Sequence, residues 1–115
     1  FQARANIRRQ VINQRVAEIT LKQTENTVRQ NVETAYNDAF AAAKTYTSTE
    51  KQVKAREEAF RMTKQRFEIG AANFVEYQVA ENDLFQSKSD LSRSKYDFIF
   101  KKRLLDFYQG KPILD

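Results

Sequence analysis

The chain has 115 residues, of which 30% are charged, and a formal net charge of +5 at pH 7. It contains two glycines, one proline, and no cysteine, histidine or tryptophan. The absence of cysteine and histidine excludes disulfides, thiol nucleophiles, imidazole bases and the usual zinc sites, so neither a metal nor a cofactor is expected. So few glycines and prolines favour long helices over a sheet, which would need turn residues about every ten positions.

The first predicted element is a helix over about residues 3–69, which would be roughly 100 Å long. Apolar or small residues recur in it every seven positions. Such a repeat keeps one stripe of a helix facing a partner helix and predicts left-handed coiled-coil packing. The seam residues of this arm are Val32, Ala39, Tyr46, Val53, Phe60 and Phe67.

A turn is predicted over residues 70–73, at one of the two glycines. Gly70 follows the sequence RFEI and can adopt the left-handed conformation that ends a helix. Asn73 can then cap a second helix, with Glu76 at its third position, as in an approximate capping box. A stop signal followed directly by a start signal predicts a helical hairpin.

The second predicted helix covers about residues 74–109 and would be roughly 54 Å long. Gly110 is expected to end it and Pro112 to prevent its continuation, which leaves a tail over residues 110–115. Its acidic residues recur every seven positions, a spacing typical of a solvated helix face and not of a catalytic pocket, so an enzyme is not expected. These acids are Asp83, Asp90 and Asp97, and the seam residues are Tyr77, Leu84, Leu91, Phe98 and Leu105.

The two repeats agree on one antiparallel register, because facing residues in such a hairpin have residue numbers with a constant sum. This rule pairs Phe67 with Tyr77, Phe60 with Leu84, Val53 with Leu91, Tyr46 with Phe98 and Ala39 with Leu105. The companion seam positions hold small or polar residues, namely Ala35, Ala42, Thr49, Ala80, Ser87 and Ser94. The predicted fold is therefore all-α, a long antiparallel coiled-coil hairpin with a closely packed seam.

The unequal arms predict an overhang. Residues before about position 34 extend past the end of the second arm and have no partner helix in this chain. Because exposed apolar stripes mark contact surfaces, the chain is expected to be flanked by other helices. The apolar residues of the overhang are Ile7, Val11, Ile12, Val16, Ile19, Leu21 and Val28, and those left bare beside the seam include Phe40, Phe85, Tyr96, Phe100 and Phe107.

Several motifs occur in a characteristic order: a Val–x–x–Ala–Tyr segment, an aromatic–Glu–aliphatic–Gly turn, and an ascending helix that carries Leu–x–Gln, then Asp–Leu, then Tyr–Asp–aromatic. The matching residues are Val32, Ala35, Tyr36, Phe67, Glu68, Ile69, Gly70, Leu84, Gln86, Leu91, Tyr96, Asp97 and Phe98. This pattern resembles the C-terminal helical repeat of TolC-type outer-membrane factors, the exit ducts of bacterial drug-efflux pumps and type I secretion systems. The start, FQARANIRRQ, is similar to the segment that follows the transmembrane strand in that family, so the resemblance covers essentially the whole chain.

The resemblance implies a homotrimer that forms a β-barrel in the outer membrane and continues it as an α-helical tunnel across the periplasm. This chain would supply one periplasmic hairpin and no part of the barrel, as a passive conduit; since it begins with Phe1, it is expected to be a piece of a longer protein. The turn would contact a periplasmic adaptor (membrane fusion) protein, which works with an inner-membrane transporter. The expected adaptor-contact residues are Ile69, Gly70, Ala71, Ala72, Asn73 and Phe74, and Glu76 would face the lumen at a constriction.

Two departures from the family pattern concern the gate. The resemblance implies a tyrosine and an arginine near the turn that tie hairpins together and hold the tunnel shut. The corresponding residues here are Phe67 and Ala72, which offer neither a phenol nor a charge. Of two acidic positions after the turn, Glu76 matches one and Val79 replaces the other. These substitutions count against a gate closed by that network.

Two alternatives to the conduit stay open from the sequence alone. The first is a cytosolic antiparallel coiled-coil scaffold. The second is a nucleic-acid-binding helical arm that uses Arg8, Arg9 and the basic cluster at residues 101–103. We rank the second alternative last and expect no nucleic acid as a partner, because the basic residues are mixed with acids and no aromatic stacking platform or known DNA-binding motif accompanies them.

Overall fold

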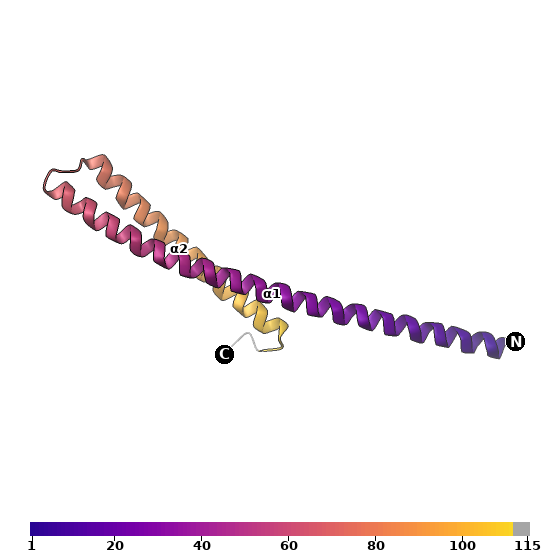
Figure 1. Cartoon of the computed structure of the whole chain (residues 1–115). Coiled ribbons are helices and arrows are strands. Elements are labelled where there is room, and N and C mark those ends of the chain that lie inside the picture. Colours follow the sequence, from indigo (N-terminus) through magenta and orange to yellow (C-terminus); the bar gives the residue numbers. More distant parts are fainter. Residues whose placement is uncertain (112–115) are drawn as a thin grey trace.

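The fold is a helical hairpin with arms of unequal length (Figure 1). The computed structural model describes residues 1–111, and this part of the chain consists of two helices and no strand: α1, Gln2–Glu68, and α2, Phe74–Tyr108. From the tip, α2 runs back along α1 and ends well short of the free end of α1. The all-α hairpin predicted from the sequence is confirmed.

The molecule is a rod. It measures 101 × 29 × 15 Å and has a radius of gyration of 27.6 Å, whereas a compact domain of this length would have a radius of about 13 Å. α1 has 67 residues, and at about 1.5 Å per residue it accounts by itself for the length of the rod. The long dimension therefore follows from an uninterrupted helix and not from the packing of several elements.

Both helices end at a glycine in the left-handed conformation. The φ angle is +78° at Gly70 and +79° at Gly110. At each end, the glycine N–H donates to the carbonyl three residues earlier, and the next N–H donates to the carbonyl five residues earlier, at 2.7 Å in the first turn and 2.8 Å in the second. This is a Schellman motif, which satisfies carbonyls that would otherwise lack a partner at the end of a helix.

The two helices begin differently. Asn73 has extended backbone angles, and its side-chain Oδ1 accepts the N–H of Glu76 at 2.8 Å, so it caps α2 as the sequence indicates. Phe1, which precedes α1, makes no side-chain capping bond. The stop expected at Pro112 falls, with the rest of residues 112–115, outside the described residues.

Small residues fill the seam between the arms. In the part of the chain that the structure describes, the buried residues are Ala35, Ala39, Ala42, Val53, Ser87 and Ser94, and no large side chain is fully buried. The larger seam residues lie half-buried, namely Val32, Tyr46, Phe60, Tyr77, Leu84, Leu91, Phe98 and Leu105. The seam is therefore narrow and allows the two backbones to approach closely.

Two ring contacts fall on pairs that the antiparallel register gives. The rings of Tyr46 and Phe98 lie 6.1 Å apart, and those of Phe67 and Tyr77 lie 5.1 Å apart. Phe67 nevertheless keeps 38% of its surface exposed, because it sits at the last turn of α1, where the seam opens into the tip.

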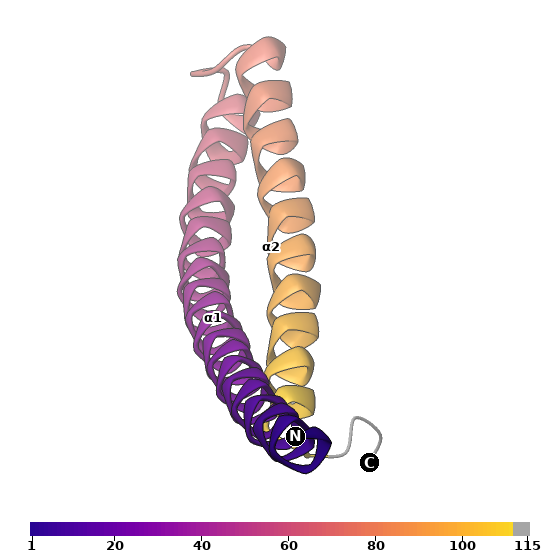
Figure 2. The same cartoon turned by 90° about the vertical axis from the view of Figure 1, so that its right-hand side faces the viewer.

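α1 curves along its length (Figure 2). Seven of its threonine hydroxyls donate to the carbonyl four residues earlier, at distances of 2.9–3.1 Å. Such bonds compete with the helical N–H for the same carbonyl and commonly bend helices. The residues are Thr20, Thr24, Thr27, Thr45, Thr47, Thr49 and Thr63.

The overhang predicted from the arm lengths is present (Figure 1). Every residue in the range 1–31 is exposed. The seven apolar overhang residues named above retain 45–60% of their surface, and the five aromatic residues beside the seam retain 53–72%. The hairpin therefore leaves a large apolar surface uncovered, and the size of this surface indicates contacts with further helices.

Candidate functional site at the hairpin tip

The segment that joins the helices, residues 69–76, is here called the tip. Backbone bonds hold it on both sides of Gly70. The carbonyl of Arg66, in the last turn of α1, accepts the N–H groups of Ala71 at 2.7 Å and Ala72 at 3.1 Å. On the other side, the cap made by Asn73 fixes the first turn of α2. The tip is thus a defined turn between two capped helix ends.

The side chain of Arg66 also crosses the tip. Its Nη2 atom donates to the carbonyl of Ala71 at 3.3 Å and lies 3.8 Å from Oε2 of Glu76. Arg66 is not among the residues that the sequence patterns single out. The antiparallel register places it close to the level of Glu76, and an arginine and a glutamate near each other across the turn are the signal that would have found it.

Four aromatic rings join the arms directly behind the tip. The ring of Tyr77 lies 5.4 Å from that of Phe60 and 5.1 Å from that of Phe67. The ring of Phe74 lies 6.2 Å from Phe67 and 6.3 Å from Tyr77. Rings at these separations attract one another beyond the effect of burial alone. Since each helix contributes two rings, the cluster fastens the arms where they enter the turn.

Apolar side chains at the tip face the solvent. Ile69 is 80% exposed, Val75 65% and Phe74 56%. A Cβ atom added at Gly70 would meet no atom within 4 Å, so the surface there is open. Of the six residues expected to contact an adaptor, Ala72 is half-buried and the other five are exposed.

An open groove of about 430 Å³ lies beside the tip, between the two arms. Two ion pairs that connect the arms line it: Arg66 with Glu76 near the turn, and Arg56 with Asp83, 3.5 Å apart, farther along. The remaining lining is largely small or apolar and includes Val79. A groove of this composition suits the side chains of a partner protein.

The acidic residues of α2 lie beside the seam. Asp83 pairs with an arginine of α1, Asp97 lies 3.3 Å from Lys101 on its own helix, and Asp90 accepts a bond from Gln86 at 3.2 Å. The carboxylates of Asp83 and Asp97 are about half exposed, at 49% and 48%. Their seven-residue spacing therefore follows from a position along the edge of the coiled-coil seam.

A polar contact connects the arms in the middle of the seam. The hydroxyls of Thr49 and Ser94 are 2.6 Å apart. Each hydroxyl also lies within hydrogen-bonding distance of a carbonyl of its own helix, Ser94 of Leu91 at 2.9 Å and Thr49 of Tyr46 at 2.9 Å. Since a hydroxyl has one proton, one of the two donates across the seam and the other donates to its carbonyl. The sequence indicates small polar seam residues at both positions, and the structure adds that they bond to each other.

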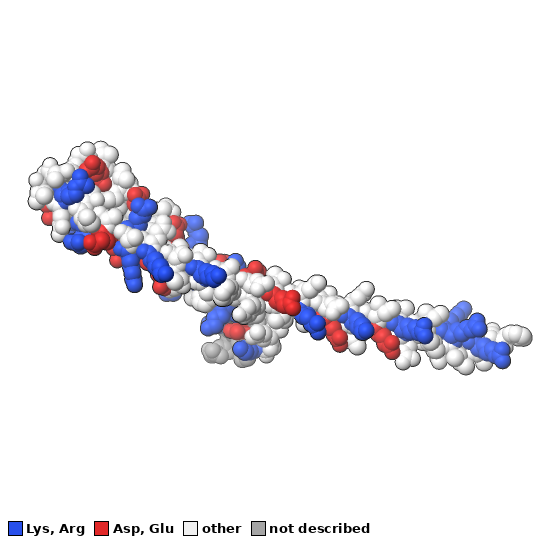
Figure 3. Space-filling view, in the orientation of Figure 1, with Lys and Arg blue, Asp and Glu red and all other residues white. Residues whose placement is uncertain are grey.

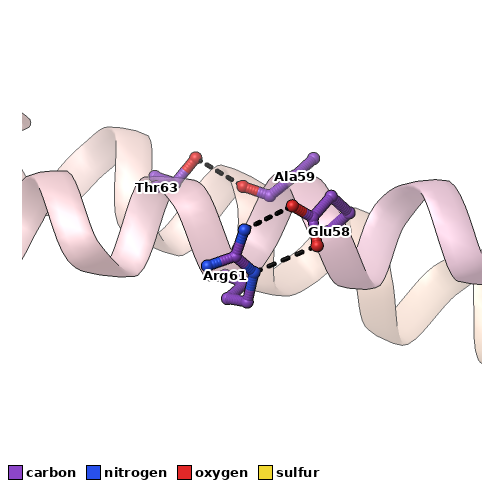
Figure 4. Close-up of polar contacts among 4 residues, drawn as sticks. All are labelled: Glu58, Ala59, Arg61 and Thr63. Atoms are coloured by element: carbon purple, nitrogen blue, oxygen red, sulfur yellow. Dashed lines mark hydrogen bonds and ion pairs between the residues drawn. The ribbon is translucent and has the colours of Figure 1, made fainter.

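Three groups of α1 away from the tip have shifted pKa values. Figure 4 shows Arg61 donating two hydrogen bonds to Glu58, one of them from Nε to Oε2 at 3.0 Å. These bonds lower the pKa of Glu58 and raise that of Arg61. A hydrogen bond with Glu50 raises the pKa of Tyr46.

Charges of both signs are spread along the rod. On the face shown in Figure 3, basic and acidic side chains alternate over most of the length, and basic residues predominate at the free end of the overhang. This face therefore carries no continuous basic track of the kind that binds a nucleic acid. None of the helices within residues 1–111 has both the length and the hydropathy that crossing a bilayer requires.

The rod, the uncovered apolar stripes and the defined tip describe an elongated helical hairpin whose exposed apolar surface indicates contacts with further helices. Within that class, the family model of the outer membrane efflux proteins matches residues 1–105. The chain belongs to this family, and the resemblance to TolC-type factors is thereby confirmed. No similar curated protein and no similar solved structure was found.

Family membership supports the first of the readings that the sequence left open: the chain is a component of an outer membrane efflux protein. The family consists of transport components and is not a family of enzymes.

Proposed function

We propose that the chain forms one hairpin in the wall of the periplasmic tunnel of an outer-membrane efflux channel, and that its tip docks to a periplasmic adaptor protein. The channel is a homotrimer. It works with the adaptor and an inner-membrane transporter in a tripartite efflux or type I secretion system. In this proposal the hairpin is a passive conduit, and the partner proteins drive the movement of the substrate.

The uncovered surface supports the place in a tunnel wall. Apolar side chains lie along the overhang and on both arms away from the seam, with about half or more of their surface exposed. A helix in a wall of helices has a neighbour on each side, so it needs apolar residues on more than one face. A hairpin that folded to function alone would not place so many large apolar side chains in water.

The observation that carries the docking proposal is the apolar surface of the tip. Ile69, Phe74 and Val75 are all more than half exposed, and they belong to the same short segment as Gly70, where a Cβ atom would meet nothing within 4 Å. Small residues at such a position permit close approach of a second hairpin. Since the caps and the ring cluster fix the turn, a partner would meet a preformed surface, and less conformational entropy is lost on binding.

We further propose that Glu76 faces the lumen at the constriction. It lies in the first turn of α2, and its side chain is 50% exposed. Its contact with Arg66 leaves part of the carboxylate open to solvent. Phe67 and Ala72 replace the tyrosine and the arginine that tie hairpins together in the family pattern. We therefore propose that, when the tunnel is closed, contacts within each hairpin hold the tip in place.

The docking proposal is tested by replacing Gly70 with glutamate in the complete protein. A charged side chain there would enter the contact with the adaptor and would lose its hydration without gaining a partner. Such a loss costs several kcal/mol, which is well over tenfold in affinity. We therefore expect Gly70→Glu to abolish both cross-linking to the adaptor and export, while the protein is still inserted and assembled.

Gly110→Glu is the matched control. Gly110 ends α2 with the same Schellman motif and nearly the same φ, and a Cβ there also meets no atom within 4 Å. The backbone strain is therefore equal, but the position is far from the tip. Equal losses in both variants would assign the effect to strain, and normal cross-linking in Gly70→Glu would refute the docking proposal.

A further inference from the structure

Arg66 is the residue whose contacts span the whole tip. It belongs to the last turn of α1, its guanidinium donates to the Ala71 carbonyl in the turn at 3.3 Å, and the same Nη2 atom lies 3.8 Å from the carboxylate of Glu76 in the first turn of α2. We propose that Arg66 is a positioning residue for partner docking: it fixes the relative placement of the two helix ends and the turn in the conformation that a partner binds. This inference rests on the proposed docking function of the tip.

The backbone and the side chain of Arg66 contribute differently. Its carbonyl accepts the N–H groups of Ala71 and Ala72, of which the Ala71 bond belongs to the Schellman motif. Both bonds join backbone groups, so they can form with any residue at this position. The contacts of the guanidinium depend on the side chain. It donates a hydrogen bond to the Ala71 carbonyl and forms an ion pair with Glu76 across the turn, and so it determines which polar groups of the tip face a partner.

The free energy of the ion pair in the isolated hairpin is small. The two side chains are 55% and 50% exposed, and exposed pairs contribute little to stability. The fold of the tip depends instead on the glycine, the Asn73 cap and the ring cluster. Loss of the guanidinium should therefore leave the hairpin folded but with a less well defined tip.

A partner that covers the groove would increase the free energy that the ion pair contributes. Arg66 and Glu76 both line the groove beside the tip, and a bound side chain there would exclude water from the pair. The attraction between the two charges grows as the local dielectric constant falls. Docking and the Arg66–Glu76 contact should therefore strengthen each other.

The position of this arginine also differs from the position that the family pattern gives. The resemblance places an arginine at Ala72, where this chain has none. The guanidinium at the turn comes here from Arg66, on the preceding helix. Its contacts lie within one hairpin, so it orders the tip rather than tying one hairpin to the next.

The test compares three variants of the complete protein: Arg66→Ala, Arg66→Lys and the control Arg61→Ala. Arg61 lies on the same helix with a similar exposure, 56%, and pairs with Glu58 without touching the turn. The measurements are the affinity for the purified adaptor and the melting temperature. We expect Arg66→Ala to weaken binding about tenfold at an unchanged melting temperature, Arg66→Lys to recover part of the loss, and Arg61→Ala to match the unsubstituted protein.

Glu76→Gln supplies an independent check, since it removes the charge but keeps the backbone N–H that Asn73 caps. It should weaken binding as Arg66→Ala does, and the double variant should lose no more than either single one. Additive losses, or a melting temperature that falls together with the affinity, would overturn the inference. If Gly70→Glu abolishes binding while Arg66→Ala leaves binding unchanged, the docking proposal is supported and the proposed role of Arg66 is wrong. If Gly70→Glu also binds the adaptor normally, the docking proposal itself is wrong.

Discussion

Glu58 and Arg61 show what an ion pair on the surface of a helix can and cannot do in this molecule. The pair lies one turn apart on α1, and its side chains are 57% and 56% exposed. At this exposure it contributes little to the stability of the helix. The two hydrogen bonds still favour the charged carboxylate, and they hold the pKa of Glu58 below its usual value. Titration is therefore a better reporter of the contact than unfolding is.

We predict that Arg61→Ala returns the pKa of Glu58 to its ordinary value. In the folded chain, this pKa is lowered by the hydrogen bond with Arg61. The stabilising contribution of the pair is then complete above the unfolded-state pKa, about 4.3 for a glutamate, and is lost as the pH falls through the folded-state pKa. The side-chain carboxyl shift of Glu58, followed by NMR against pH, measures this. Arg56→Ala is the control, because Arg56 pairs with Asp83; a Glu58 titration unmoved by Arg61→Ala would contradict the assignment.

The residues of the tip differ in how far the sequence reveals them. Gly70 and Asn73 are found from the sequence because each acts through its own conformational preference, one for the left-handed region and one for the capping position. Arg66 is missed because its role depends on what faces it across the turn. Local preference is visible in a linear pattern, whereas a contact between two elements becomes visible only once their register is applied to every charged residue.

At the scale of the elements, the hairpin depends on a narrow seam with polar residues in it. Ser87 and Ser94 are 2% and 8% exposed, and they face α1 one heptad apart. Ser87 donates to the Leu84 carbonyl of its own helix at 2.7 Å. Ser94 makes the equivalent bond and also contacts Thr49 of the other arm. Two similar serines thus differ in one bond between the arms, which makes them a matched pair for measurement.

We predict that Ser94→Ala destabilises the hairpin by about 1 kcal/mol more than Ser87→Ala does, the usual net value of one hydrogen bond. Ser87→Ala should be close to neutral, because alanine favours helix and the bond lost is local. Denaturant unfolding of both variants measures the difference, and a double-mutant cycle with Thr49→Val isolates the coupling between the arms. Equal effects of the two serine substitutions, or a coupling energy near zero, would show that the contact between the hydroxyls does not stabilise the seam.

The register of the arms follows from the sequence because two independent seven-residue repeats have to agree. The rings of Tyr46 and Phe98 meet at 6.1 Å, as that agreement requires. The sequence gives less information about the depth of burial. Phe67 belongs to the same repeat but stays 38% exposed, because the repeat specifies which face a side chain lies on and not where along the rod the facing helix ends.

At the scale of the whole molecule, the dominant feature is the difference in length between α1, with 67 residues, and α2, with 35. This difference follows from the positions of the glycines that end the two helices, and the overhang is therefore predictable from the sequence. What covers the overhang is not, since no residue of α2 reaches it. Each of residues 1–31 is exposed. Only helix propensity and hydrogen bonds within the helix then keep these residues helical, and isolated helices gain little stability from these two sources.

We predict that the overhang exchanges its amide hydrogens much faster than the paired part of α1 when the 115-residue chain is studied alone. The residues before Val32 have no tertiary contact to protect them, whereas those from Ala35 onward pack against α2. Local opening free energies in a protein range from near zero at unsupported ends to the global value in packed elements. Hydrogen exchange with mass spectrometry, repeated at several chain concentrations and in the complete assembled protein, measures this contrast.

In the assembled channel, we expect the overhang to become as well protected as the paired segment, since neighbouring helices would then cover its apolar stripe. In the isolated chain, protection that rises with concentration would show that copies associate through the same stripe, which is the behaviour of an exposed apolar face. Full protection of residues 1–31 in a dilute, monomeric sample would contradict the prediction. It would mean that the chain shields this stripe by itself, and the hairpin would then need no neighbouring helices to cover its apolar surface.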